Sequence, residues 1–158
     1  MHGQVSQETL VAVAASTVWG VYRGLELGRL VDELLPDVIG RVEVVEGDGG
    51  VGTIVKLTFP PGTLGAGYLK EIFTRIDDEK RIKETEIIEG GYKELGFQVY
   101  RIRLEIIEKE AESAIIRSTI EYVVDDKFAD NASLVTTKPL ETMAEAIGKY
   151  LAEKKTKA

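Results

Sequence analysis

Alternation of apolar and polar residues is the clearest pattern in the chain, and it predicts strands. Over residues 100–106, Tyr100 and Ile102 begin one apolar side, while arginines and a glutamate occupy the other. Residues 113–124 alternate in the same way. A period of two residues with one polar face is typical of antiparallel strands that cover a core on one side only.

A hairpin is predicted over residues 68–89, and it carries most of the candidate chemistry. Its β-branched and aromatic residues favour strands, and the Asp-Asp-Glu run at 77–79 favours a turn because short acidic side chains bond to their own backbone. Tyr68, Glu71 and Lys83 lie on this hairpin. If the strands curl around a cavity, we expect these three groups to point into it.

Two short helices are predicted near the start of the chain. A first strand is expected over residues 5–14, and Ser16 or Thr17 can cap the helix that follows through its hydroxyl oxygen. A second short helix begins near Leu27, and Pro36 ends it because proline cannot continue a helix.

A long helix is predicted at the other end of the chain, from about Asp130. Its apolar stripe includes Leu140 and Met143, with glutamates and lysines on the opposite face. Pro139 is expected to kink or restart this helix. The lysine-rich tail after it is interpreted as a solvated helix end that complements the helix dipole.

A glycine-rich segment, Gly47 to Gly52, lies between two further predicted strands at 41–46 and 53–59. A phosphate cradle would need Gly-Lys-Ser/Thr at its end, whereas this segment continues into Thr53. We therefore predict a hairpin turn, in which glycines supply positive φ angles. A loop follows over residues 60–67, and Gly90-Gly91 turns the chain again.

The order of elements is one strand, two short helices, about six strands and one long helix. Sequential strands without intervening helices predict an antiparallel meander, and helices on one face of it make an α+β fold. A strongly curved sheet around a long helix would enclose space, and such internal sites bind mostly apolar ligands.

Composition narrows the classes of partner and of site chemistry that the protein could have. The 158 residues are expected to form a single domain with a real core, and the net charge of −7 disfavours nucleic acid and anionic membranes as partners. The absence of cysteine excludes thiolate chemistry. The single histidine, His2, is expected to be disordered near the start, so neither a metal site nor a histidine-based triad is predicted. Without an apolar run of about 20 residues or a signal peptide, the chain is interpreted as cytoplasmic.

Three stretches carry a resemblance to a known family. They are LLPDVIGRVEVVEGDGGVGTIVKLTFPPG at 34–62, KEIFTRIDDEKRIKETEIIEGGYKELGF at 70–97 and STIEYVV at 118–124. The chain resembles, from about Val11 to Leu151, the norcoclaurine synthase-like and norbelladine synthase-like branch of the plant birch pollen allergen (pathogenesis-related class ten) family. The resemblance implies a seven-stranded antiparallel sheet wrapped around a long C-terminal helix (a helix-grip, START-like fold), with two short helices and an internal hydrophobic cavity.

The resemblance also implies an activity. Norcoclaurine synthases join dopamine to 4-hydroxyphenylacetaldehyde by a Pictet–Spengler reaction, and norbelladine synthases join tyramine to 3,4-dihydroxybenzaldehyde. Lys83 and Glu71 match the lysine and glutamate that carry this chemistry, and Tyr68 matches the assisting tyrosine in the norbelladine pattern but is displaced by one residue from the norcoclaurine pattern. Ile102 stands where the norcoclaurine pattern has an aspartate, which puts ring closure in doubt and leaves amine–aldehyde condensation as the expectation.

Each candidate residue also has a simpler interpretation. Lys83 could be a solvated charge on an outer face, and Glu71 could form a salt bridge with a neighbouring cation. In an apolar pocket, however, Lys83 could protonate a carbonyl oxygen and Glu71 could deprotonate an amine. Tyr68 either closes the pocket mouth or orients a substrate hydroxyl.

The remaining candidates are expected to form the substrate-binding wall. They are Ile102, Tyr100, Phe97, Phe73, Leu140 and Met143. For Ile102, Tyr100 and Phe97, the alternative is a core position behind the wall.

The sequence thus favours a plant alkaloid-biosynthesis enzyme, a lyase that condenses a phenethylamine with an aromatic aldehyde. It would need no cofactor, because water loss and ring closure are redox-neutral. The product would either cyclise or pass to a downstream reductase. The main alternative is a non-catalytic protein that binds or carries hydrophobic plant metabolites or hormones, with Lys83 and Glu71 as a structural ion pair. A third is a chaperone-like catalyst of a later alkaloid step.

Overall fold

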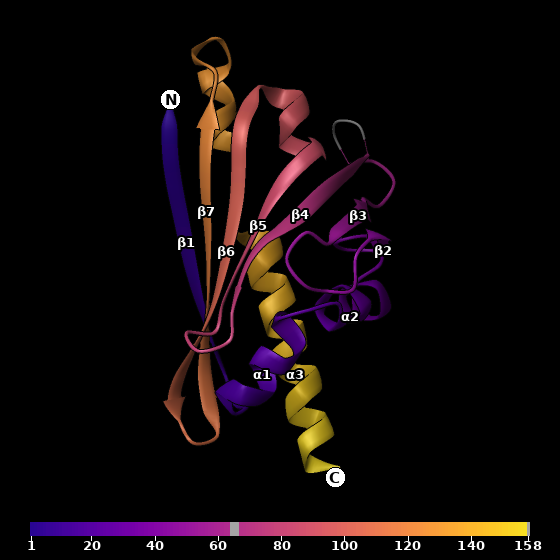
Figure 1. The fold of residues 1–158 in the computed structure, drawn as a ribbon, viewed down its shortest axis with the longest axis vertical. Helices are drawn as coiled ribbons and strands as arrows, with labels where there is room; N and C mark the ends of the chain where they lie inside the picture. Colours follow the sequence, from indigo (N-terminus) through magenta and orange to yellow (C-terminus); the bar gives the residue numbers. More distant parts are fainter. Residues whose placement is uncertain (64–66, 158) are drawn as a thin grey trace.

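A strongly curved antiparallel sheet grips one long helix in the computed structural model, which describes residues 1–63 and 67–157 (Figure 1). The sheet has seven strands in the order β1-β7-β6-β5-β4-β3-β2. Their bounds are β1 His2–Val11, β2 Arg41–Glu46, β3 Ile54–Thr58, β4 Tyr68–Asp77, β5 Ile82–Gly90, β6 Phe97–Glu110 and β7 Ser113–Val124. The predicted α+β fold, with its seven strands and three α-helices, is confirmed.

The helices lie on the concave side of the sheet. They are α1 Ala15–Tyr22, α2 Glu26–Leu34 and α3 Lys138–Thr156, with 3₁₀ helices η1 Gly91–Leu95 and η2 Asp126–Leu134. Helix α3 contacts β1 closely because Gly148 has no side chain: a Cβ there would meet Val11 Cγ1 at 2.4 Å. Among the described helices, none is both long and apolar enough to cross a bilayer.

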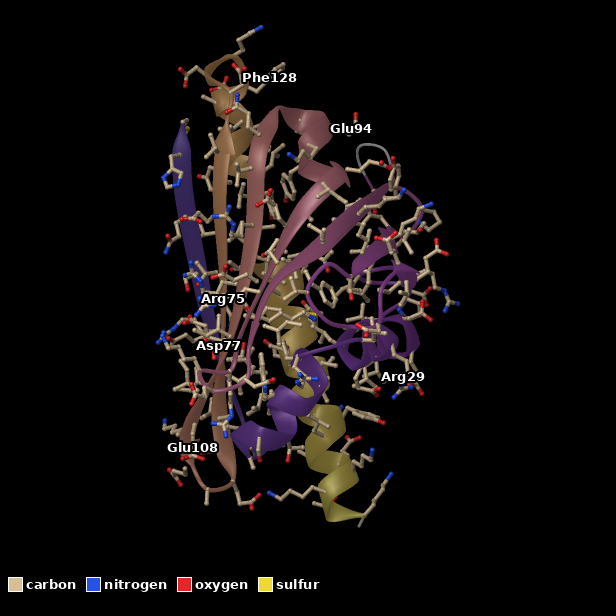
Figure 2. All side chains as sticks on the ribbon, viewed as in Figure 1. Arg29, Arg75, Asp77, Glu94, Glu108 and Phe128 are labelled. Carbon is tan, nitrogen blue, oxygen red and sulfur yellow. The ribbon has the colours of Figure 1, made fainter. Side chains whose placement is uncertain are left out.

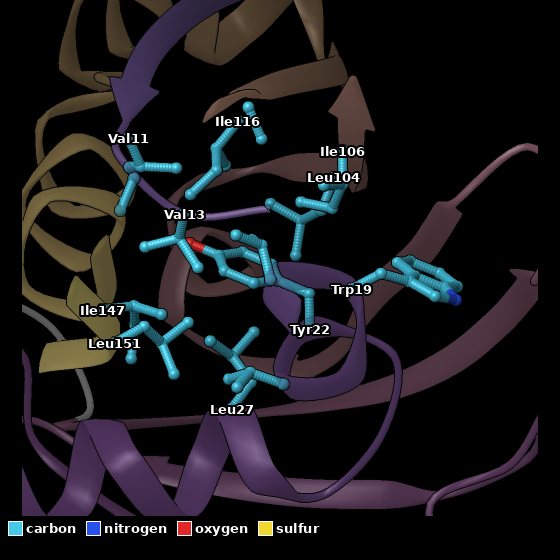
Figure 3. Packing of buried hydrophobic residues seen from close by; sticks show 14 of the residues in the cluster. Val11, Val13, Trp19, Tyr22, Leu27, Leu104, Ile106, Ile116, Ile147 and Leu151 are labelled. Carbon is cyan, nitrogen blue, oxygen red and sulfur yellow. The ribbon is translucent and has the colours of Figure 1, made fainter. Parts of the chain in front are cut away.

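The core divides the molecule into two halves. In the lower half of Figure 1, α1, α2 and α3 pack directly on the sheet around the fully buried ring of Tyr22, and Figure 3 shows this ring beside Val13 and close to Ile116. A second apolar cluster, which includes Phe97, Tyr100 and Tyr122, belongs to the other half. Alternation directs Tyr100 inward on β6, as predicted, and Tyr122 inward on β7. Phe97, three residues before Tyr100, also turns inward because the strand pairing is irregular between Phe97 and Val99.

Ion pairs between neighbouring strands cover the outer face of the sheet. Arg101 on β6 contacts both Glu86 on β5 at 3.1 Å and Glu121 on β7 at 2.9 Å. Arg103 contacts Glu84 at 3.2 Å. Opposite charges on neighbouring strands stabilise the strand pairing. The outward-facing charged residues of the alternating strands therefore also help to specify the fold.

The start of the chain differs from the prediction. The first strand runs over His2–Val11 rather than 5–14, and His2 is an ordered strand residue paired with Val123, so the expectation of disorder is wrong. The position before α1 is Ala14, and no side chain caps the helix. The proposed caps, Ser16 and Thr17, lie inside α1 instead.

The glycine-rich segment is a hairpin turn between β2 and β3, as predicted. Gly47, Gly49 and Gly52 all have positive φ. The Gly49 N–H donates to Thr53 Oγ1 at 2.9 Å, and the Gly50 N–H donates to Asp48 Oδ1 at 3.1 Å. These two amides are therefore already satisfied within the turn, which gives the phosphate interpretation no support.

The C-terminal helical region is split in two. Residues 126–134 form η2, and α3 begins only at Lys138, with Pro139 in its first turn. Proline fits the first turn of a helix because the N–H it lacks has no partner there. Pro139 therefore starts α3 rather than kinking it.

Candidate active site

A cavity of about 820 Å³ lies between the concave face of the sheet and the helices. Its walls come from β2 to β7, α2, α3 and the two 3₁₀ helices, and they are mostly apolar. The volume lies within the range of about 300–1,000 Å³ that is usual for small-molecule sites. The predicted internal hydrophobic cavity is therefore present.

The inner face of the β4–β5 hairpin supplies the cavity's central polar groups. Glu71 and Phe73 project inward from β4, and Lys83 and Thr85 project inward from β5. Phe73 lies directly opposite Thr85 in the strand pairing, with irregular pairing between Lys70 and Glu71 and again between Phe73 and Arg75. All four side chains line the cavity.

Lys83 is almost completely buried, with 2% of its surface exposed. Its Nζ donates to the carbonyl oxygens of Tyr22, at 3.0 Å, and Gly24, at 3.2 Å, where α1 ends. Nζ also lies 3.8 Å from the centre of the Phe73 ring, where the face of the π-system attracts a cation. An ammonium has three N–H donors, so two hydrogen bonds leave one for a ligand.

Burial changes the acidity of Lys83. Desolvation lowers the pKa of its ammonium to about 8, partly opposed by the negative charge of Glu71 and assisted by the positive charge of Arg23. A group with this pKa is still largely protonated at neutral pH but gives up its proton more readily than an exposed lysine. Lys83 can therefore act as a general acid.

Glu71 shows the opposite change. Desolvation raises the pKa of its carboxyl group above the usual value, and the positive charge of Lys83 and the hydrogen bond from Thr85 oppose this shift. The Thr85 hydroxyl donates to Glu71 Oε2 at 3.1 Å. A carboxylate with a raised pKa is a stronger base, so Glu71 can accept a proton from an amine.

Glu71 and Lys83 attract each other through space but do not form a salt bridge in the described part of the chain. The ammonium is held on the α1 side, and the carboxylate is held by Thr85. The cavity thus presents a separated base and acid, which together can move protons on two small molecules bound between them.

Stacked tyrosines form another part of the cavity wall. The rings of Tyr92 and Tyr100 lie 4.4 Å apart and nearly parallel, and both residues line the cavity. The Tyr92 hydroxyl donates to the Leu134 carbonyl at 3.0 Å and so links η1 to η2. Burial raises the pKa of Tyr100, which keeps its phenol protonated.

Phe97 is not part of the cavity wall, so this prediction is wrong. Its ring packs edge-on against Tyr92, with the centroids 5.3 Å apart, and against Tyr122 at 5.6 Å. Phe97 is a core residue behind the tyrosines. The other predicted wall residues line the cavity, namely Phe73, Tyr100, Ile102, Leu140 and Met143.

Tyr68 lies on the outer face of β4, so the prediction that it points into the cavity is also wrong. Its hydroxyl donates to Glu89 Oε2 at 2.7 Å, and Lys56 Nζ lies 5.1 Å from the centre of its ring. Tyr68 and Glu71 are three residues apart, and an odd separation places two residues of a strand on opposite faces.

Three features of the site were missed from the sequence. Alternation puts Thr85 on the face of Lys83, two residues away, but Thr85 was not predicted to have a role in the site. Tyr92, directly after the predicted turn at Gly90-Gly91, was given no role, although its side chain reaches the cavity from η1. The backbone carbonyls of Tyr22 and Gly24 have no sequence signal at all, since every residue carries one.

Comparisons with known proteins identify the family of the chain. Residues 1–154 match the model of the pathogenesis-related protein Bet v 1 family. The chain is 49% identical over 156 residues to norbelladine synthase of Narcissus pseudonarcissus, covering 99% of this chain and 96% of that one. It is 42% identical over 154 residues to S-norcoclaurine synthase 2 of Papaver somniferum, covering 96% and 66% of the two chains.

A solved structure of a norcoclaurine synthase has a similar fold. The crystal structure of norcoclaurine synthase from Thalictrum flavum, in complex with dopamine and hydroxybenzaldehyde, superposes with a TM-score of 0.87 at 37% identity, covering 97% of this chain and 88% of that one. The resemblance seen in the sequence is confirmed, and the chain belongs to the pathogenesis-related protein Bet v 1 family.

Proposed function

We propose that the protein catalyses the condensation of a phenethylamine, such as tyramine or dopamine, with an aromatic aldehyde. One observation carries the proposal: a carboxylate with a raised pKa and an ammonium with a lowered pKa face one apolar cavity from paired strands. Titratable groups whose environments shift their pKa values in this way are typical of acid–base sites. The names of the similar proteins and the ligands of the Thalictrum structure support this substrate class.

Glu71 and Lys83 have complementary roles in the proposed reaction. Glu71 takes a proton from the substrate ammonium, and the free amine attacks the aldehyde carbon while Lys83 protonates the carbonyl oxygen. Lys83 then regains a proton from the new N–H₂⁺ group, and Glu71 returns its proton to the hydroxyl, which leaves as water. The product is an iminium ion, and both side chains end in their starting states.

The apolar wall has its own role. It holds two reactants together in a site with little water, and fixed proximity of this kind accounts for much of the rate of two-substrate reactions. Ile102, which lies opposite Thr85 in the strand pairing, adds no charge to this part of the wall. We therefore expect condensation to proceed without a second carboxylate in the centre of the cavity, and we propose that the imine either leaves for a reductase or closes to a ring.

The test is to incubate the purified protein with tyramine or dopamine and a set of aromatic and arylacetic aldehydes. Cyanoborohydride added to one half of each reaction distinguishes the products, because an open imine gains two hydrogens and a cyclised product of the same mass gains none. We expect product above the buffer rate and, where a ring closes, one enantiomer in excess. A racemic product at the buffer rate would reject the proposal.

One observation favours a carrier function instead. The bonds from Lys83 to the Tyr22 and Gly24 carbonyls give the buried ammonium a structural task, since they join β5 to the end of α1. A carrier would bind apolar metabolites in the same cavity and would keep its affinity when Lys83 or Glu71 is replaced, without turnover of any amine–aldehyde pair.

A further inference from the structure

Thr85 is a buried hydroxyl on the strand that also carries Lys83. Only 3% of its surface is exposed, and it lies opposite Phe73 on the inner face of β5. Its Oγ1 donates to Glu71 Oε2 at 3.1 Å. A side-chain hydrogen bond thus joins the two strands of the hairpin at the cavity wall.

This bond makes the two oxygens of the Glu71 carboxylate different. Oε2 is occupied by the hydroxyl, whereas Oε1 has no hydrogen bond from a described residue. A carboxylate accepts hydrogen bonds at both oxygens, so Oε1 remains available to an N–H group of a ligand. The hydroxyl therefore leaves one basic oxygen free on the side of the cavity.

The same bond affects the relation between Glu71 and Lys83. In an apolar cavity, opposite charges attract strongly because the local dielectric constant is low. Lys83 is restrained by the carbonyls of Tyr22 and Gly24, and Glu71 is restrained by Thr85. Without the Thr85 bond, nothing on β5 except the ammonium itself would hold the carboxylate.

We propose that Thr85 is a positioning residue for the condensation. Its hydroxyl fixes Oε2 of Glu71, keeps the carboxylate apart from the Lys83 ammonium, and leaves Oε1 free to take the proton of the substrate amine. The inference rests on the function proposed above, but the Thr85–Glu71 contact can be measured without any turnover.

Other groups also act on this carboxylate or share its cavity. Lys83 is the cation that attracts Glu71, and Arg23 acts on Lys83 from the end of α1. The remaining polar and charged groups in the wall come from η1, β6, α2 and the segments at 63 and 136; they are Tyr92, Tyr100, Glu26, Arg29, Asp32, Thr63 and Thr136. None of these donates a hydrogen bond to Glu71, so among the described residues Thr85 alone does so.

The matched variants are Thr85→Val, which replaces the hydroxyl with a methyl group of similar size, and Thr85→Ser, which keeps the hydroxyl. We expect Thr85→Val to lower kcat by about 10- to 100-fold with little change in KM, since misplacing a catalytic group by about 1 Å costs roughly this much. Thr85→Ser should stay within about 3-fold of the wild-type kcat, because its hydroxyl can still bind Oε2.

The second readout is the titration of Glu71 itself in the ligand-free protein. Carboxyl ¹³C chemical shifts are followed against pH in protein labelled at glutamate, and the Glu71 signal is identified by its loss in Glu71→Gln. Because a hydrogen bond to the charged form lowers a carboxyl pKa, the Glu71 midpoint should move to higher pH in Thr85→Val and stay in place in Thr85→Ser.

The outcomes separate the two proposals. An unchanged Glu71 midpoint in Thr85→Val, or equal losses of kcat in both variants, would overturn the role of Thr85. A shifted midpoint with an unchanged kcat would also overturn it, because the contact would then have no effect on the reaction. If the wild type turns over no amine–aldehyde pair, the proposed function fails, and the midpoint alone still decides whether Thr85 holds the carboxylate.

Discussion

The two faces of the β4–β5 hairpin carry the same kinds of charged residue but offer different chemistry. On the outer face, Glu84 contacts Arg75 at 3.4 Å and Arg103 at 3.2 Å. On the inner face, Glu71 and Lys83 contact no charged partner among the residues that the structure describes, and both lie in an apolar cavity. Figure 2 labels Arg75 over the strands, close to Asp77, with which it forms an ion pair at 3.2 Å.

Solvent explains the difference. Ion pairs on the outer face are partly hydrated, and such pairs contribute about 0–1 kcal/mol each. The inner groups have lost most of their water without gaining an ion-pair contact, so their charged forms are destabilised and their pKa values shift toward neutral pH. The protein thus uses outer charges for strand pairing and inner charges as a proton donor and acceptor.

The largest expected effect is that of Lys83→Met. Loss of the proton donor should lower kcat/KM by about 10²–10⁴-fold, the usual contribution of a general acid. Its matched control is Lys70→Met on the outer face of β4, where Lys70 contacts Glu89 at 3.5 Å, and that variant should keep nearly full activity. Steady-state kinetics on the pair, with cavity occupancy followed by a fluorescent apolar ligand, checks the comparison. Equal losses in both variants would contradict it.

Glu71→Gln should have the next largest effect. The amide keeps the size of the side chain but cannot accept the amine proton, so we expect kcat/KM to fall by about 10²-fold. Glu89→Gln on the outer face is the control and should change the rate by less than about 3-fold, because an exposed carboxylate contributes little beyond its surface pair. Residual activity should rise with pH, as more substrate amine is already deprotonated. A fully active Glu71→Gln would remove Glu71 from the mechanism.

The pH dependence of the rate gives a third test. Activity should rise as Glu71 ionises, above the ordinary pKa of a glutamate, and should fall as Lys83 loses its proton near pH 8. Arg23→Gln separates this fall from titration of the substrate amine. Removing that positive charge raises the pKa of Lys83. The alkaline limb of the pH–rate profile therefore moves to higher pH if Lys83 causes it, and stays in place if the substrate amine causes it. An alkaline limb that stays in place in Arg23→Gln would assign it to the substrate.

Stability should depend on pH through the same lysine. The folded-state pKa of Lys83 lies near 8, below the unfolded value of 10.5, so between these values the unfolded chain binds one more proton than the folded one. As the pH rises from about 8 to 10.5, the free energy of unfolding of the wild type should therefore increase by about 1–3 kcal/mol relative to that of Lys83→Met. Chemical denaturation of both proteins at several pH values measures it, and a flat difference would contradict burial of the charge.

The smallest expected effect is that of Tyr68→Phe. The hydroxyl bond to Glu89 lies on the exposed face, so its loss should leave stability almost unchanged and should change kcat/KM by less than about 3-fold. Kinetics and thermal melts on this variant test the placement directly. A large loss of activity would mean that Tyr68 reaches the substrate, contrary to its outward position.

Much of the site was predictable because strand alternation is a local property. Ile102 was placed on the apolar side of its strand by a period of two residues. Alternation left Lys83 free to face either side, and the family resemblance assigned it to the cavity. Strict alternation would put Arg75 on the face of Glu71 and Phe73, but the irregular pairing between Phe73 and Arg75 reverses the alternation and turns Arg75 outward to Glu84. Such bulges have no reliable sequence signal, so alternation does not predict which face a residue beyond them occupies.

The sequence by itself determined the order of strands and helices, the antiparallel pairing, the turn at Gly47–Gly52 and the family resemblance. Each of these follows from periodicity, from local backbone preferences or from motifs that neighbouring residues spell out. Only the tertiary structure decided that the Tyr22 and Gly24 carbonyls hold Lys83, that Thr85 holds Glu71, and that Tyr68 faces solvent. The contact between Lys83 and the Tyr22 carbonyl joins residues 61 positions apart. The outward position of Tyr68 depends on which face of β4 is buried. Tertiary packing decides both, and local sequence does not.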